Sequence, residues 1–134
     1  MVLYTPGRTS GYPEEPVESG IRLHFLGGGD EVGNVGCLLE DRTGTRVLID
    51  YGLAPTRPPR YPKECPPIEH TIITHSHIDH IGMAPWLVGQ YGAALHGTTL
   101  TAAVSEIMWR DTYKVSSIEG YPLPWDKRDL DAAL

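Results

Sequence analysis

Apolar and polar residues alternate along the first half of the chain, and this period of two is typical of β-strands. Residues 21–26 and 35–40 show the alternation. A turn at 41–44 leads into residues 45–49, so the second and third strands are predicted to form a hairpin. Residues 71–74 are apolar and β-branched, as in a strand buried on both faces.

The second half of the chain has helical features. Residues 83–91 form one helical segment, and the apolar residues of a second, at about 100–114, fall at helical spacing. Thr99 is available to cap the longer helix. A short strand is expected at 93–96, and residues 126–134 begin a further helix. Mixed strands followed by helices predict an α/β (α+β) fold.

Composition sets the size and broad class of the protein. Residues 1–20 are rich in Pro, Gly, Glu and Ser and predict a flexible N-terminal arm, which leaves residues 21–134 for the domain. The 134 residues suit one domain, and 40% of them are hydrophobic, enough for a core. Eleven basic against 17 acidic residues give a net charge of −6. This balance disfavours a chain whose main function is to coat nucleic acid, although an enzyme with a local basic groove remains compatible with it.

The cellular environment is inferred from the cysteines and from the absence of long apolar runs. Only Cys37 and Cys65 occur, and two free thiols in a reducing compartment are favoured over a disulfide framework. No apolar run approaches the roughly 20 residues of a membrane span. The polar N-terminus is unlike a signal peptide. We therefore expect a cytoplasmic protein with no membrane partner.

The most informative segment is residues 75–80, which follow the apolar strand directly. His75 and His77 lie on the same side of an extended chain, so their imidazoles can chelate one metal ion. Asp79 and His80 lie where the chain turns towards the next helix and can reach a second metal. Imidazole and carboxylate ligands together suit Zn²⁺, with Mn²⁺ or Fe²⁺ as alternatives. An isolated histidine is usually structural, but three within six residues beside a carboxylate favour a metal site.

This segment also carries a family resemblance. Residues 74–82, Thr-His-Ser-His-Ile-Asp-His-Ile-Gly, resemble the HxHxDH signature of the metallo-β-lactamase superfamily. Asp50, after the strand at 47–49, resembles the first motif of that family, whose carboxylate supports the metal ligands. The Gly-rich residues 27–33 look like the opening of the same fold. The resemblance implies the N-terminal part of an αββα sandwich.

Looser motifs resemble one branch of the superfamily, the β-CASP nucleases. Residues 84–87 look like the stretch that follows the metal motif in those enzymes, and so do residues 98–100 leading into 107–112. The branch includes RNA-processing enzymes such as ribonuclease J and the endonuclease subunit of the cleavage and polyadenylation machinery. The resemblance therefore implies an RNA substrate and leaves open whether cleavage is endonucleolytic or exonucleolytic.

The same resemblance implies roles for individual residues. His75 and His77 would bind one zinc ion, Asp79 and His80 would bind a second, and Asp50 would orient these ligands. The zinc ions would share a hydroxide that attacks the phosphodiester, so Asp79 and Asp50 are the expected catalytic residues. A third histidine, a bridging aspartate and a further histidine normally come from later motifs, which this chain does not contain. We therefore expect a downstream segment or a partner chain to complete the site.

Two alternatives remain open at this stage. A glyoxalase II-like thioesterase would use the same histidine and aspartate cluster. A non-catalytic half-domain would instead complete its fold with a partner chain, because a partial sandwich exposes a sheet edge and an apolar face.

Overall fold

The computed structural model describes residues 2–3 and 20–134. The predicted N-terminal arm, residues 1–20, falls mostly outside these described residues and stays a prediction. The elements follow one another as β1 (Val2–Leu3), β2 (Ile21–Gly27), β3 (Gly36–Glu40), β4 (Arg46–Tyr51), β5 (His70–Ile72), α1 (Ile78–Ile81), α2 (Ala84–Tyr91), β6 (Ala94–His96), α3 (Thr99–Glu119) and α4 (Lys127–Ala133).

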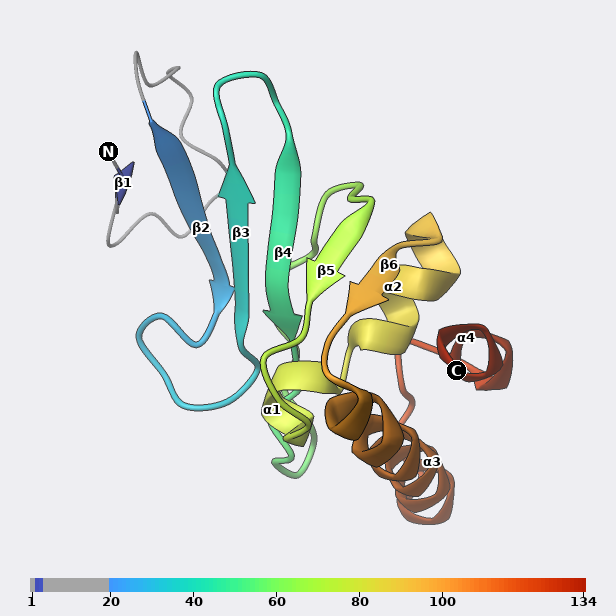
Figure 1. The fold of residues 1–134 in the computed structure, drawn as a ribbon. Helices are drawn as coiled ribbons and strands as arrows, with labels where there is room; N and C mark the ends of the chain where they lie inside the picture. The colour runs from blue at the N-terminus through green and yellow to red at the C-terminus, as the bar shows by residue number, and fades with distance from the viewer. Residues whose placement is uncertain (1, 4–19) are drawn as a thin grey trace.

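The strands form one mixed sheet in the order β1-β2-β3-β4-β5-β6 (Figure 1). Strands β2, β3 and β4 are antiparallel, which confirms the predicted hairpin, whereas β4, β5 and β6 run parallel. Strand β5 is shorter than the predicted 71–74 and begins one residue earlier. Strand β4 extends two residues beyond its predicted end and so includes Asp50. This extension brings Asp50 to the edge of the sheet from which the residues after β5 emerge.

The two faces of the sheet differ in burial. One face packs into the core through His24, Leu38, Leu48 and Thr71, all of them buried. On the opposite face the register aligns another row of mainly apolar side chains, and its outer members, Phe25 and Ile72, remain exposed. Part of this apolar face is therefore open to solvent.

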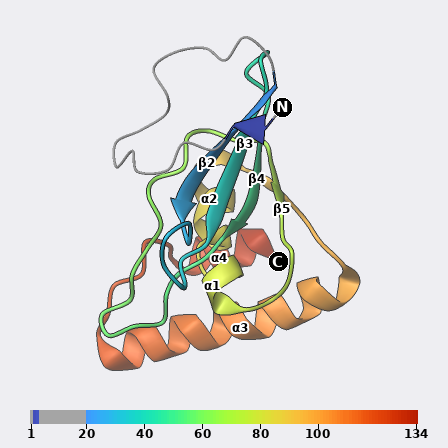
Figure 2. The same ribbon diagram turned by 90° about the vertical axis from the view of Figure 1, so that its left-hand side faces the viewer.

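Helices close one end and one side of this sheet. Helix α1 contacts β4, and α3 contacts α1 at the end towards which β4, β5 and β6 point (Figures 1 and 2). Helix α2 contacts β6, and α4 packs against α2 and α3. In the part of the chain that the structure describes, no helix is both long and apolar enough to cross a membrane.

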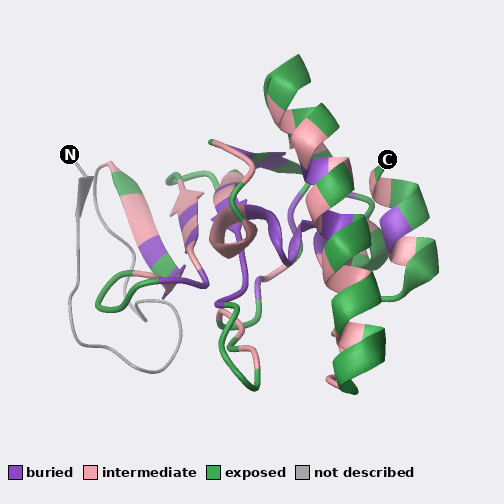
Figure 3. Cartoon of the chain, turned by 90° about the horizontal axis from the view of Figure 1, so that it is seen from below, coloured by how far each residue is buried: buried purple, intermediate pink, exposed green. Residues whose placement is uncertain are grey.

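The long helix is confirmed, with two corrections. Its cap is Thr98 rather than Thr99, since the Thr98 hydroxyl accepts a hydrogen bond from the Thr101 amide at 3.1 Å. Its apolar residues do not all face the core. Leu100 is 74% exposed and Ile107 is 65% exposed, and most of the outer surface of α3 is open to solvent (Figure 3).

The buried side of α3 depends on one large aromatic residue. Trp109 is buried and donates a hydrogen bond through Nε1 to the carbonyl oxygen of Ile81 at 2.8 Å. Trp125, before α4, donates in the same way to the carbonyl oxygen of Gly82 at 2.8 Å. Both indoles therefore satisfy carbonyl groups at the C-terminal end of α1, and they hold in place the helix that carries Asp79 and His80.

The cysteines agree with the expectation of free thiols. Cys37 and Cys65 are both free. Burial raises the pKa of Cys65 to about 12 and also raises the pKa of Cys37. Neither thiol is activated as a nucleophile at neutral pH, because the thiolate is the reactive form.

The buried His24 predicts a loss of stability in mild acid. Burial is the main cause that lowers the pKa of His24 from its ordinary value of 6.5. Below pH 6.5 the unfolded chain therefore binds a proton at this position more readily than the folded chain, and the free energy of unfolding decreases. Urea unfolding between pH 7.5 and pH 5 should show a steeper loss for the wild type than for His24→Leu. Equal pH dependence in the two chains would contradict this account.

Candidate metal centre

The predicted metal-binding residues gather at the ends of two parallel strands. Residues 73–77 continue from β5, and α1 then carries Asp79 and His80. Asp50 is the next-to-last residue of the adjacent strand β4. Because the carboxyl ends of parallel strands meet at one edge of a sheet, Asp50 reaches the start of the cluster although 24 residues separate it from Thr74.

Asp50 is the buried centre of a hydrogen-bond network. Its Oδ1 accepts from the Thr74 amide at 2.8 Å, and its Oδ2 accepts from the Thr74 hydroxyl at 2.6 Å. The same Oδ2 lies 2.7 Å from Nδ1 of His80. Asp50 has a φ of 59°, a left-handed conformation that few residues other than glycine adopt. These contacts hold a strained residue in place, as is often found at functional sites.

The network fixes the proton on His80. An ionised carboxylate only accepts hydrogen bonds, so Nδ1 of His80 must be the donor to Asp50. The proton of a neutral His80 is therefore on Nδ1, and Nε2 keeps its lone pair. That nitrogen faces Asp79, whose Oδ2 lies 3.8 Å away. The arrangement is that of a carboxylate that orients a histidine and fixes its tautomer.

Thr74 fixes the tautomer of His75 through its hydroxyl group, as Asp50 does for His80 through its carboxylate. This role of Thr74 was not predicted from the sequence. The Thr74 hydroxyl has one proton, which it donates to Asp50. Its contact of 2.9 Å with Nδ1 of His75 therefore requires His75 to donate. Nε2 of a neutral His75 is again left with a free lone pair. The only sequence signal was a hydroxyl residue directly before the cluster.

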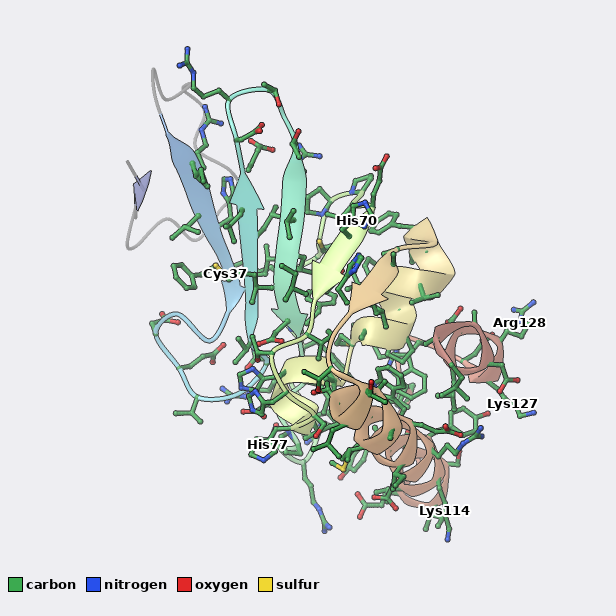
Figure 4. The ribbon with its side chains drawn as sticks, viewed as in Figure 1. Cys37, His70, His77, Lys114, Lys127 and Arg128 are labelled. Carbon is green, nitrogen blue, oxygen red and sulfur yellow. The ribbon has the colours of Figure 1, made fainter. Side chains whose placement is uncertain are left out.

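The four predicted ligands lie together. The ring centroids of His75 and His80 are 4.0 Å apart, and those of His75 and His77 are 4.7 Å apart. His77 is exposed beside α1 (Figure 4). Among the described residues, no three His, Cys, Asp or Glu side chains converge on one point as the ligands of a bound metal do. The fit to a metal ion is therefore one of donor type and proximity, with imidazole nitrogens and a carboxylate gathered at one edge.

Backbone contacts hold the start of α1 against the residue before β3 and the segment after β4. The amide of Val35 donates to the carbonyl oxygen of Asp79 at 2.9 Å, and the amide of Leu53 donates to that of Ile78 at 3.2 Å. Gly52 lies so close to this turn that a Cβ atom there would overlap the Asp79 carbonyl group and the His80 amide nitrogen. The site therefore depends on a glycine at position 52, which sequence reasoning did not single out.

Comparison with known proteins identifies the family. A model described as the metallo-beta-lactamase superfamily matches residues 28–132. The chain belongs to the metallo-beta-lactamase superfamily.

Individual relatives are longer than this chain. It is 34% identical over 122 residues to "Transcription termination factor FttA" of Lokiarchaeum sp., covering 85% of this chain and 19% of the relative. It is 31% identical over 108 residues to "RNase aCSPSF2" of Saccharolobus solfataricus, covering 77% of this chain and 22% of the relative. It is 28% identical over 122 residues to "Cleavage and polyadenylation specificity factor 73" of Drosophila melanogaster, covering 85% of this chain and 18% of the relative. These relatives confirm the predicted likeness to the β-CASP ribonuclease group, and the chain spans about a fifth of their length.

The solved structures that match this chain include an archaeal metallo-beta-lactamase superfamily protein from Sulfolobus tokodaii, 17% identical, with a TM-score of 0.41. The match covers 85% of this chain and 47% of the other. The predicted fold class, part of a metallo-β-lactamase-type α/β fold, is confirmed by the family match.

Proposed function

We propose that this chain provides the first half of the active site of a zinc-dependent ribonuclease of the β-CASP type. The observation that carries the proposal is the network around Asp50, which leaves Nε2 of both His75 and His80 free to bind a metal. The relatives support RNA as the substrate, because the name of one includes "RNase" and that of another includes "cleavage and polyadenylation".

In this proposal each residue of the cluster has one task. His75 and His77 hold one metal ion, Asp79 and His80 hold a second, and Asp50 orients His80 directly. Zinc is the expected ion and Mn²⁺ the alternative. When bound, zinc lowers the pKa of a coordinated water and withdraws charge from a phosphodiester. Thr74 and Asp50 keep Nδ1 of the two histidines protonated, so that no rearrangement of protons is needed before the metal binds.

The remaining ligands would come from a downstream segment or from a partner chain. This part of the proposal rests on the length of the relatives, of which the chain spans about a fifth. We also propose that residues 21–134 form the N-terminal portion of the catalytic domain after an arm at 1–20, and that the protein acts in the cytoplasm.

The proposal predicts metal-dependent RNA cleavage that requires Asp79. A fluorescently labelled RNA oligonucleotide is incubated with the zinc-loaded protein joined to the segment or partner chain that completes the site, with the same preparation after chelation, and with its Asp79→Ala variant. We expect the zinc-loaded sample to cleave the RNA. Cleavage should be lost after chelation, which removes the metal, and in Asp79→Ala, because Asp79 supplies a carboxylate ligand. Asp131→Ala, a substitution at an exposed position of α4 away from the cluster, is the matched control and should cleave as the wild type does.

Two outcomes would count against this function. Cleavage that persists both after chelation and in Asp79→Ala would show that the cluster is not the catalytic site. Thioester hydrolysis without RNA cleavage would favour the glyoxalase II-like alternative.

A further inference from the structure

Two histidines outside the metal cluster lie beside each other on neighbouring strands. His70 is the first residue of β5 and His96 is the last residue of β6. The parallel register pairs His70 with Ala94 and Ile72 with His96. Because alternate residues of a strand share a face, His70 and His96 project from the same face of the sheet. Figure 4 shows His70 beside β5, at a distance from His77 and the metal cluster.

The two imidazoles are in direct contact and accessible to solvent. Nδ1 of His70 lies 3.0 Å from Nε2 of His96, and the ring centroids are 5.1 Å apart. Both residues are exposed. A hydrogen bond between two imidazole nitrogens needs one donor and one acceptor, so at least one of the rings presents a lone pair to the other. When both rings are neutral, a change of tautomer gives two lone pairs side by side.

The two nitrogens are close enough to bind one metal ion together. Imidazole nitrogens lie roughly 2.0–2.1 Å from a divalent transition metal. Two such nitrogens at a right angle are about 2.9 Å apart, whereas at the tetrahedral angle they are about 3.4 Å apart. The observed 3.0 Å is also the length of the hydrogen bond between the two rings, so it brings both nitrogens within reach of one ion without selecting a coordination geometry.

We propose that His70 and His96 form a second, bidentate metal site for a divalent transition-metal ion, with Cu²⁺ first and Ni²⁺ second. His70 binds through Nδ1 and His96 through Nε2, and water occupies the other positions. The preference follows from the general order of affinity of nitrogen ligands, in which Cu²⁺ exceeds both Ni²⁺ and Zn²⁺. The site shares no ligand with the cluster around Asp50 and does not depend on the proposed function.

The test separates this pair from the main cluster. Cu²⁺ is added to the chain carrying His75→Ala and His77→Ala, which removes two donors of the main cluster, and electron paramagnetic resonance reports the number of nitrogen ligands. We expect one Cu²⁺ with two imidazole nitrogens. Adding His70→Asn or His96→Asn should leave one nitrogen and weaken binding by about tenfold or more, because the second imidazole no longer binds intramolecularly.

Control experiments separate a loss of Cu²⁺ binding from a loss of folding. Circular dichroism establishes that the Asn variants remain folded, and their exposed positions make the substitutions mild. Ni²⁺ and Zn²⁺ titrations of the same chains should give affinities in the order Cu²⁺, Ni²⁺, Zn²⁺. Equal Cu²⁺ affinity with and without His70 or His96 would overturn the proposal and show an adventitious ion only. A signal with no coupling to two nitrogens would overturn it as well.

Discussion

Gly52→Ala is expected to destabilise the chain by about 3 kcal/mol or more and to abolish metal binding. The added methyl group would overlap the carbonyl group of Asp79 and the amide nitrogen of His80. These are backbone atoms at the start of α1, and they cannot turn away as the end of a flexible side chain can. The strand or the helix must therefore shift, and either movement separates Asp50 from His80. Urea unfolding followed by circular dichroism, together with zinc binding by the variant, measures both effects.

Gly97→Ala is the matched control for this substitution. Its added Cβ would lie 3.6 Å from the nearest atoms, which is ordinary contact. Stability should change by less than about 1 kcal/mol and zinc binding should be unaffected. A Gly52→Ala chain as stable as Gly97→Ala, with zinc binding intact, would show that the close approach at position 52 is not required.

Asp50→Asn is expected to weaken zinc binding by about 10- to 100-fold, the usual effect of removing a carboxylate that orients a metal-binding histidine. Asp50 accepts three hydrogen bonds, and Asn keeps its shape while replacing one acceptor oxygen with a donor. At least one of Thr74 and His80 then loses its partner, and an amide group of the buried position 50 is left without an acceptor, which reduces stability by about 1–3 kcal/mol. Zinc competition with a chromogenic chelator measures the affinity. An unchanged zinc affinity in this variant would contradict the proposed role of Asp50.

Thr74 gives a more specific test of the same network. Thr74→Val removes the hydroxyl and keeps the shape of the side chain, whereas Thr74→Ser keeps the hydroxyl and serves as the control. Nitrogen-15 NMR of the metal-free chain should show His75 protonated on Nδ1 in the wild type and in Thr74→Ser. The Val variant should lose that preference and bind zinc more weakly. The same tautomer distribution in all three chains would contradict the argument from the hydrogen bonds.

Local patterns in the sequence predicted most of the strands and helices. The alternation at 21–26 and 35–40 and the apolar β-branched run before the cluster each report burial within one element. The structure confirms these elements to within a few residues at their ends. The motif at 75–80 could be identified for the same reason, since all of its residues lie within one short segment.

Features that depend on contacts between distant segments were not predictable in this way. The role of Thr74 requires that the end of β4 lie beside the end of β5, and the need for glycine at position 52 requires the backbone of α1 to be nearby. The spacing of apolar residues in α3 predicted the helix but not the face it buries. Leu100 and Ile107 remain exposed because the core contact is made mainly by Trp109.

Zinc content of the purified chain tests the central claim most directly. The claim is that residues 75–80, oriented by Asp50, bind metal. Elemental analysis after dialysis compares the wild type with the double variant His75→Ala/Asp79→Ala, and circular dichroism establishes that both are folded. Because the chain supplies only part of the ligands in this account, we predict that the wild type retains up to about one zinc ion per chain and that the double variant retains none. A double variant that retains as much zinc as the folded wild type would contradict the account.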